Sequence, residues 1–384
     1  MVRLMAVFFV VAALGAACGK GNKGGGTVKI EFMGALSGDY KLLVEPGFEA
    51  AKLAFDQANA SGDLDVKVVL EAQDTQGDPT QATSIANKIV SDDAVVGVIG
   101  PAFSGESGAV GDTLDQAGIP FVTQSATDDA LSTHGWTHWF RALGNNSSQA
   151  VPEAQYIAQI TKPNCAVVAQ DGSAYGKGLA EIAAKTLTDS GVDVSSQEQV
   201  DPNSKDFSAL VAKVQSSGCK ALSYGGYSPQ AGPIRKQLTQ AGLSDVQMVA
   251  GDGIKDDAFL QLAGDAGEGT IAGCGCAEIN NSDDPDAKKF VADFTAATGD
   301  APGIYAAEGW DVAQIFIAAM KDGNTDRASI TDFIANLSGF KGLTKTYSFQ
   351  DNGELDEAAV VTFFYKDTGG AWVVQGPSTD ILTG

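Results

Sequence analysis

Short β-branched runs alternate with longer helical patterns from Val28 onward, and this alternation restricts the chain to the α/β class. The runs expected to form strands are Val28–Phe32, Val66–Leu70, Val95–Ile99, Ala166–Ala169, Ala221–Tyr224 and Val246–Ala250. Apolar residues recur at helical spacing between them, over Phe48–Ala60, Asp78–Ile89, Tyr175–Ser190, Phe207–Ser217 and Pro229–Ala241. Regular β-α-β alternation predicts parallel sheets with helices on both faces.

The chain is long enough for two such domains. It has 384 residues, 44% of them hydrophobic and 19% charged, as a globular protein does. At roughly 100–200 residues per domain, this length predicts two lobes, each with its own core. The formal net charge of −23 repels phosphate backbones, so we expect no nucleic-acid partner.

The last third of the chain departs from the alternation. Helices are expected over Asp286–Ala297, Ala306–Lys321 and Ile330–Leu337, followed by strands over Thr344–Phe349, Ala358–Tyr365 and Ala371–Val374. Such a tail indicates that the chain returns between the two lobes and does not add a third domain.

The N-terminus resembles an export signal. One cation at Arg3, an uncharged apolar run over Met5–Leu14 and small residues before Cys18 predict a signal peptide over residues 1–17. Leu14–Cys18 resembles a bacterial lipobox, in which Cys18 becomes lipidated and tethers the protein to a membrane, although Gly15 stands where a Leu-like residue is usual. Residues 18–27 are Gly-rich and would form a flexible linker. Ordinary secretion is the alternative.

Four further cysteines would then lie in an oxidising compartment, where an even number favours disulfides. Cys165 and Cys219 each open a predicted strand, and neighbouring strands would bring them together. We favour that pair. The state of Cys274 and Cys276 is left open, because a bridge across one residue is strained and a metal site lacks other ligands.

Polar residues follow the predicted strands, where parallel sheets bind ligands. Ser104, Ser125 and Thr127 offer hydroxyls and backbone N–H groups that suit a carboxylate. Tyr175, Tyr227 and Asp252 follow strands of the second half. Asp252 has an alternative role as a helix N-cap.

At these residues the sequence resembles the periplasmic leucine/isoleucine/valine-binding proteins of ABC transporters. The shared motifs, in the family's order, are Val98–Gly100 with Ser104, Ser125–Thr127, Tyr175–Ala180, Lys205–Leu210 and Tyr224–Tyr227. The resemblance implies two lobes of the type I periplasmic-binding fold, a parallel doubly wound sheet in each and a hinge of three crossings. It also implies an amino acid ligand and a partner complex of ABC permease and ATPase.

The resemblance assigns roles to individual residues. Ser104, the backbone at Ser125 beside Ala126, and Thr127 would hold the ligand carboxylate. Tyr175 and Tyr227 would line the opposite lobe, and Asp252 would accept the ammonium, with Asp where close relatives have Glu. The predicted ligand-binding set, with Leu43 in place of a frequent aromatic, is Leu43, Ser104, Ser125, Ala126, Thr127, Tyr175, Tyr227 and Asp252.

Signatures of catalysis are weak. His134 and His138 have metal-like spacing but read as a packed turn without a nearby carboxylate, so no metal is expected. Tyr175–Gly178 imitates a dinucleotide fingerprint but lacks its third Gly, and no nucleophile and base pair stands out. We therefore expect a binding protein without a cofactor and rank an enzyme last.

The sequence as a whole predicts a monomeric, extracytoplasmic solute-binding lipoprotein of an ABC importer. Lobe 1 would comprise residues 28–144 and 276–350, and lobe 2 residues 145–275 and 351–384, with crossings near Gly144, Cys274 and Asp351. An amide or urea binder, and a sensor domain that feeds a signalling receptor, are the alternatives.

Overall fold

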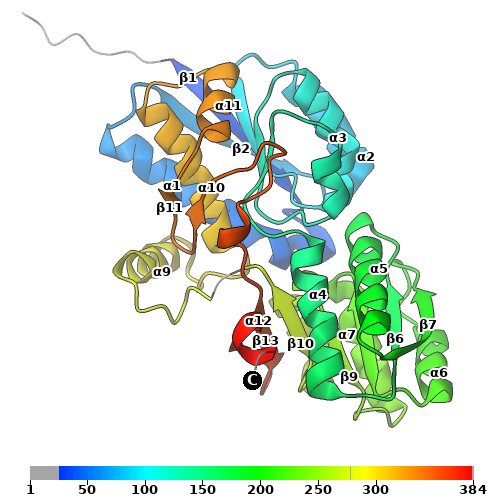
Figure 1. Ribbon diagram of the computed structural model, residues 1–384. Coiled ribbons are helices and arrows are strands. Elements are labelled where there is room, and N and C mark those ends of the chain that lie inside the picture. Colours follow the sequence, from blue (N-terminus) through cyan, green and yellow to red (C-terminus); the bar gives the residue numbers. More distant parts are fainter. Residues whose placement is uncertain (1–25, 277, 383–384) are drawn as a thin grey trace, which may run out of the picture.

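The computed structural model describes residues 26–276 and 278–382. The predicted signal peptide and Cys18 lie outside the described residues. Within those ranges, no helix combines the length and the apolar character needed to cross a membrane. Two lobes, each built on its own sheet, make up the molecule (Figure 1).

The first lobe contains a five-stranded sheet in the order β2-β1-β3-β4-β5. All neighbouring strands are parallel, and they are β1 (Thr27–Gly34), β2 (Lys67–Asp74), β3 (Val95–Ile99), β4 (Phe121–Thr123) and β5 (Trp139–Arg141). The helices of this lobe are α1 (Lys41–Ser61), α2 (Pro79–Ile89), α3 (Ser104–Gln116), α9 (Pro285–Thr298), α10 (Ala306–Lys321) and α11 (Arg327–Ala335). Two glycines let α1 and α10 approach closely, because a Cβ on Gly309 would collide with the backbone of Gly47.

The second lobe contains a seven-stranded sheet in the order β14-β13-β10-β9-β8-β6-β7. Its parallel strands are β6 (Cys165–Gln170), β7 (Asp193–Gln199), β8 (Ala221–Gly225), β9 (Gln247–Ala250) and β10 (Ile271–Cys274). Two antiparallel strands from the end of the chain, β13 (Phe363–Asp367) and β14 (Trp372–Pro377), extend this sheet. Its helices are α4 (Asn146–Tyr156), α5 (Ala174–Asp189), α6 (Ser208–Ser217), α7 (Ser228–Gln240), α8 (Asp257–Ala263) and α12 (Ser378–Leu382).

The chain passes between the lobes three times. It leaves β5 for α4, leaves β10 for α9, and returns from the small hairpin of β11 (Phe340–Lys341) and β12 (Thr346–Tyr347) to β13. Residues 351–355 still pack on the first lobe, because Gly353 O accepts the backbone N–H of Arg141 at 2.9 Å. Gly353 and Glu354 are buried there, and the third crossing runs through residues 356–362.

Two disulfides lie in the second lobe and at its edge. Cys165 begins β6, and Cys219 lies just before β8, the strand paired with it; the two Cα atoms are 4.9 Å apart and the sulfurs are bonded. A second disulfide joins Cys274 and Cys276 where the chain leaves β10.

Removing the Cys165–Cys219 disulfide should destabilise the second lobe. The bridge closes a span of 54 residues, and the chain entropy it removes from the unfolded state corresponds to about 2–4 kcal/mol. We expect the Cys165→Ser/Cys219→Ser variant to lose about that much unfolding free energy in urea titrations. The Cys274→Ser/Cys276→Ser variant is the control, because its bridge spans two residues and constrains the unfolded chain far less. Equal losses in both variants would contradict the loop-closure explanation.

Candidate functional site

The carboxyl ends of strands from the two sheets face each other across a narrow cleft. The cleft is lined by residues of both lobes, namely Leu43, Val44, Ala102, Phe103, Ser104, Ser125, Tyr175, Tyr227, Asp252, Gly253 and Tyr305. Six of the eight predicted ligand-binding residues are among them, and the other two, Ala126 and Thr127, are buried next to Ser125. The free space is about 10 Å³, roughly room for one water molecule, so the lobes must part before an amino acid can enter.

Ser104 presents a hydroxyl to the cleft from the first turn of α3. Its Oγ accepts the backbone N–H groups of Thr127 at 3.2 Å and of Asp128 at 3.1 Å. The described chain offers no acceptor for the hydrogen of this hydroxyl, which leaves it available to donate. Together with the partial positive charge at the start of α3, this donor suits a carboxylate.

The loop after β4 supplies the rest of the polar surface in the first lobe. Ser125 Oγ donates to Ala102 O at 2.8 Å, so its hydroxyl is engaged within the lobe. Ala126 N donates to Thr123 Oγ1 at 2.9 Å. The hydroxyl of Thr127 is buried and has no hydrogen-bond partner within the described chain. An unpaired buried hydroxyl is costly, which makes Thr127 a candidate for ligand contact.

Glu106 lies in the same turn of α3, and its charge state matters for any anion bound there. It is fully buried, and burial raises the pKa of its carboxyl to about 8. Glu106 is therefore neutral at pH 7 and does not repel a carboxylate held by Ser104.

Asp252 presents a buried carboxylate from the second lobe. It begins a short 3-10 helix after β9, and Tyr305 donates a hydrogen bond to its Oδ2 at 2.6 Å across the cleft. Burial raises the pKa of Asp252, while hydrogen bonds from Tyr305 and Tyr175 oppose that rise. Its side chain caps no helix; Asp256 caps α8 by accepting from Phe259 N. The N-cap alternative for Asp252 is therefore excluded.

Aromatic rings form the apolar wall of the site. Tyr227 of the second lobe makes edge contacts with Tyr40 and Phe103 of the first, each with ring centroids 5.4 Å apart. Tyr175 lies on its other side at 5.1 Å. Leu43, on the first turn of α1, is buried and adds an aliphatic surface.

Three residues around Asp252, namely Tyr305, Gln149 and Glu153, were not predicted from the sequence. Tyr305 precedes α10 with a left-handed backbone, φ +61°, which is uncommon outside glycine and frequent at functional sites. Gln149 and Glu153 lie on α4 behind Asp252, and Gln149 Oε1 accepts the N–H of Asp252 at 3.2 Å. Tyr305 directly precedes the helix predicted over Ala306–Lys321, and that position is a signal by which it could have been found. The helix α4 was not predicted, so nothing in the sequence pointed to Gln149 or Glu153.

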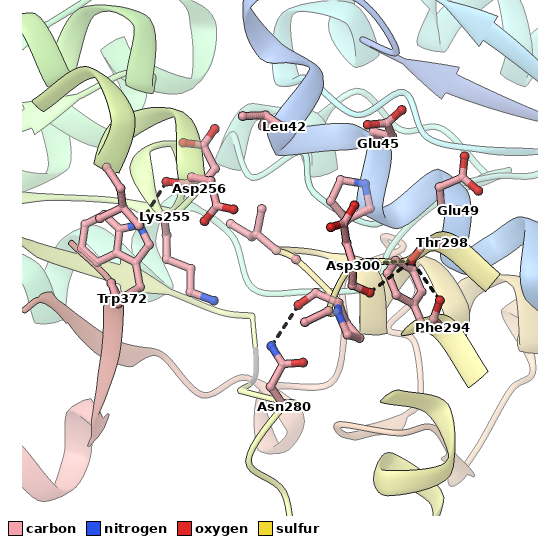
Figure 2. A pocket seen from close by; sticks show the side chains of 18 of the residues that line it. Leu42, Glu45, Glu49, Lys255, Asp256, Asn280, Phe294, Thr298, Asp300 and Trp372 are labelled. Carbon is pink, nitrogen blue, oxygen red and sulfur yellow. Dashed lines mark hydrogen bonds between the residues drawn. The ribbon is translucent and has the colours of Figure 1, made fainter. Parts of the chain in front are cut away.

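A wider pocket lies beside the cleft, but its chemistry differs (Figure 2). It has a volume of about 770 Å³, and its lining includes Lys255 and, across the pocket from it, the carboxylates Glu45 and Glu49. Lys255 stacks on Tyr365, with its Nζ 4.2 Å from the ring centroid, and burial lowers its pKa. None of the predicted ligand-binding residues lines this pocket.

The two histidines serve the packing of the first lobe. His134 stacks on Trp136, and His138 Nδ1 lies 2.8 Å from Asp115 Oδ1. The expectation that no carboxylate lies near them was wrong, because the fold brings Asp115 of α3 beside His138. In the described ranges, no group of three or more His, Cys, Asp and Glu side chains could hold a metal.

Comparisons with known proteins agree with this architecture. The Leu/Ile/Val-binding protein homolog 3 of Brucella melitensis is 30% identical over 356 residues, 92% of this chain and 90% of the relative. The leucine-, isoleucine-, valine-, threonine- and alanine-binding protein of Pseudomonas aeruginosa is 28% identical over 331 residues, 86% of this chain and 87% of the relative.

The fold itself matches a solved structure. The branched-chain amino acid transporter substrate-binding protein LivJ of Streptococcus pneumoniae, in complex with isoleucine, superimposes with a TM-score of 0.82 at 25% identity, covering 91% of this chain and 98% of LivJ. Residues 27–366 match the family model described as periplasmic binding protein. The chain therefore belongs to the periplasmic binding protein family of solute-binding, two-lobed proteins.

Proposed function

We propose that the protein is an extracytoplasmic solute-binding lipoprotein of an ABC importer that closes two lobes around a branched-chain or related aliphatic amino acid. The observation that carries the proposal is the polarity of the cleft. Free hydroxyl donors at Ser104 and Thr127 lie in one lobe, and a buried carboxylate at Asp252 lies in the other. A zwitterion needs a donor set for its carboxylate and an acceptor for its ammonium, and the two lobes supply one each.

The walls of the cleft favour an aliphatic side chain. Leu43, Phe103 and Tyr227 surround the space with apolar surface, and burial of such a side chain contributes roughly 1.5–3 kcal/mol. The relatives described above are named for the binding of leucine, isoleucine and valine. Both points support leucine, isoleucine or valine as ligand.

The alternative of an amide or urea binder is weaker on electrostatic grounds. Asp252 is buried, and a neutral amide would leave this carboxylate without a cation. A sensor that feeds a signalling receptor would use the same cleft. Genes for a permease and an ATPase beside the gene for this protein would favour transport over sensing.

We expect the protein to bind its ligand without changing it chemically. Ligand binding would stabilise the closed form, which would dock as a monomer on the permease. Chemical turnover of a bound ligand would contradict the expectation of a binding protein without catalytic activity.

Asp252→Asn should weaken binding of leucine by about 2–5 kcal/mol, because the ligand ammonium would be buried without a counter-charge. Calorimetry on wild type and variant measures the difference. Asp256→Asn is the matched control: it removes a buried Asp that caps α8 and bonds Ser228, so it should lower stability and leave affinity unchanged. Equal affinities of wild type and Asp252→Asn for leucine would contradict the role of Asp252.

Closure should be visible in solution. Saturating leucine should reduce the radius of gyration measured by small-angle scattering, because the contacts come from both lobes. At a ligand concentration about ten times the wild-type Kd, Thr127→Ala should show less than about half of this change, because the lost hydrogen bond to the carboxylate weakens binding by roughly 1.5–3 kcal/mol.

The control for this experiment is Thr188→Ala, which removes a hydroxyl bonded to Ala184 O within α5. It should close like wild type. Scattering that does not change when calorimetry shows leucine bound would count against closure by domain rotation.

The proposed anchor at Cys18 has its own test. Wild type should partition with membranes, whereas Cys18→Ser should stay uncleaved or lose its acyl chains. Fractionation followed by mass spectrometry of the N-terminus distinguishes these states. Release of wild type and variant into the soluble fraction in equal amounts would support ordinary secretion.

A further inference from the structure

Arg141 is the largest buried cation near the carboxylate-binding loop, yet it does not line the cleft. It ends β5 with no exposed surface. Its Nη1 donates to Ala126 O at 3.2 Å and to Asp128 O at 2.8 Å. Its Nε donates to Glu354 Oε2 at 3.0 Å, and Nη2 bonds the other carboxylate oxygen of Glu354. The guanidinium is therefore held between the loop after β4 and the segment that precedes the third crossing.

The two carbonyls bound by Arg141 flank the N–H groups that Ser104 accepts. Ala126 O and Thr127 N belong to the same peptide group, whose carbonyl accepts from Arg141 on one edge and whose N–H donates to Ser104 Oγ on the opposite edge. Asp128 contributes its N–H to Ser104 and its carbonyl to Arg141. A hydrogen-bonded chain thus runs from the guanidinium through the loop to the Ser104 hydroxyl.

We propose that Arg141 is a positioning residue that makes Ser104 a donor to the ligand carboxylate. Its charge polarises the peptide between Ala126 and Thr127, and the two N–H groups occupy the acceptor positions of Ser104 Oγ. The hydroxyl hydrogen of Ser104 is then free for the ligand alone. Bonds in such a chain strengthen one another. The inference rests on the proposed function, since it takes a carboxylate as the group bound by Ser104.

The geometry requires an arginine at this position. One planar fork binds two carbonyls and both oxygens of Glu354, whereas the ammonium of a lysine is a point charge that could not span them. Glu354 balances the charge, so Arg141 acts through the peptide dipoles and not as a bare charge on the ligand. This pairing also fixes the loop to residues 351–355, immediately before the chain crosses to the second lobe.

The first experiment measures leucine affinity by calorimetry. Arg141→Lys should weaken binding by about 10-fold or more, and Glu354→Gln should weaken it in the same direction. Arg235→Lys is the matched control: Arg235 is also buried and donates to two backbone carbonyls, Ser244 O and Val246 O, but in the second lobe away from the cleft. Thermal melts of all variants establish that they fold.

The second experiment separates positioning from general loosening of the lobe. In a Ser104→Ala background, Arg141→Lys should change leucine affinity by less than about 2-fold, because the group through which it acts is gone. The proposal would be overturned if Arg141→Lys weakened leucine binding as much in the Ser104→Ala background as in the wild-type background. Unchanged affinity in Arg141→Lys alone would also overturn it.

A third measurement needs no ligand. The amides of Thr127 and Asp128 should exchange with deuterium more slowly in wild type than in Arg141→Lys or Glu354→Gln, and at the wild-type rate in Arg235→Lys. Equal exchange in all four proteins would overturn the positioning role. Wild-type protein that binds no amino acid would overturn the proposed function instead, and the exchange rates would still decide whether Arg141 orders the loop.

Discussion

The buried carboxylate of Asp252 can persist only where polar groups from both lobes reach it. An ionised carboxylate away from water is costly unless it is hydrogen-bonded, and Asp252 receives hydroxyls from Tyr175 in its own lobe and Tyr305 in the other. Opening the lobes removes the Tyr305 bond and returns water to the carboxylate. The state of the cleft and the solvation of Asp252 are therefore coupled, and the ligand ammonium that we propose to bind there would compensate the charge and favour closure.

The sequence predicted the parallel sheets, the two lobes and the polar residues at the strand ends, because buried parallel strands are apolar runs that stand out. It did not reveal β5 or β7. The outer strand β7 has mostly polar residues and alternates between exposed and half-buried positions, so it lacks an apolar signal. The strand β5 is three residues long. Of the site, the residues that follow strands were found, whereas Tyr305, Gln149 and Arg141 act through contacts between segments far apart in the chain, which periodicity cannot show.

Some of the many acidic residues are buried, and burial favours the neutral, protonated form of their carboxyl groups. Burial raises the pKa of Glu106 to about 8 and, with a smaller contribution from Asp252, holds that of Glu153 well above its usual value. Both groups bind protons in the folded state that the unfolded chain releases near pH 4.5. Ionising them in the folded state costs desolvation energy, so the stability of the fold declines as pH rises above about 4.5; for Glu106 the decline extends to about pH 8.

The second crossing limits how the lobes can move. Lys345 of the first lobe donates to Gly275 O at 3.4 Å and pairs with the buried Glu308, while Tyr365 of the second lobe donates to Cys276 O at 2.9 Å. The crossing is thus held from both sides, and the disulfide between Cys274 and Cys276 spans the same residues. The part of this crossing at Gly275 and Cys276 is thus fixed to both lobes and can serve as a pivot between them. The closure proposed above would then be a rotation between preformed surfaces, and little of the binding free energy would be lost to ordering of the chain.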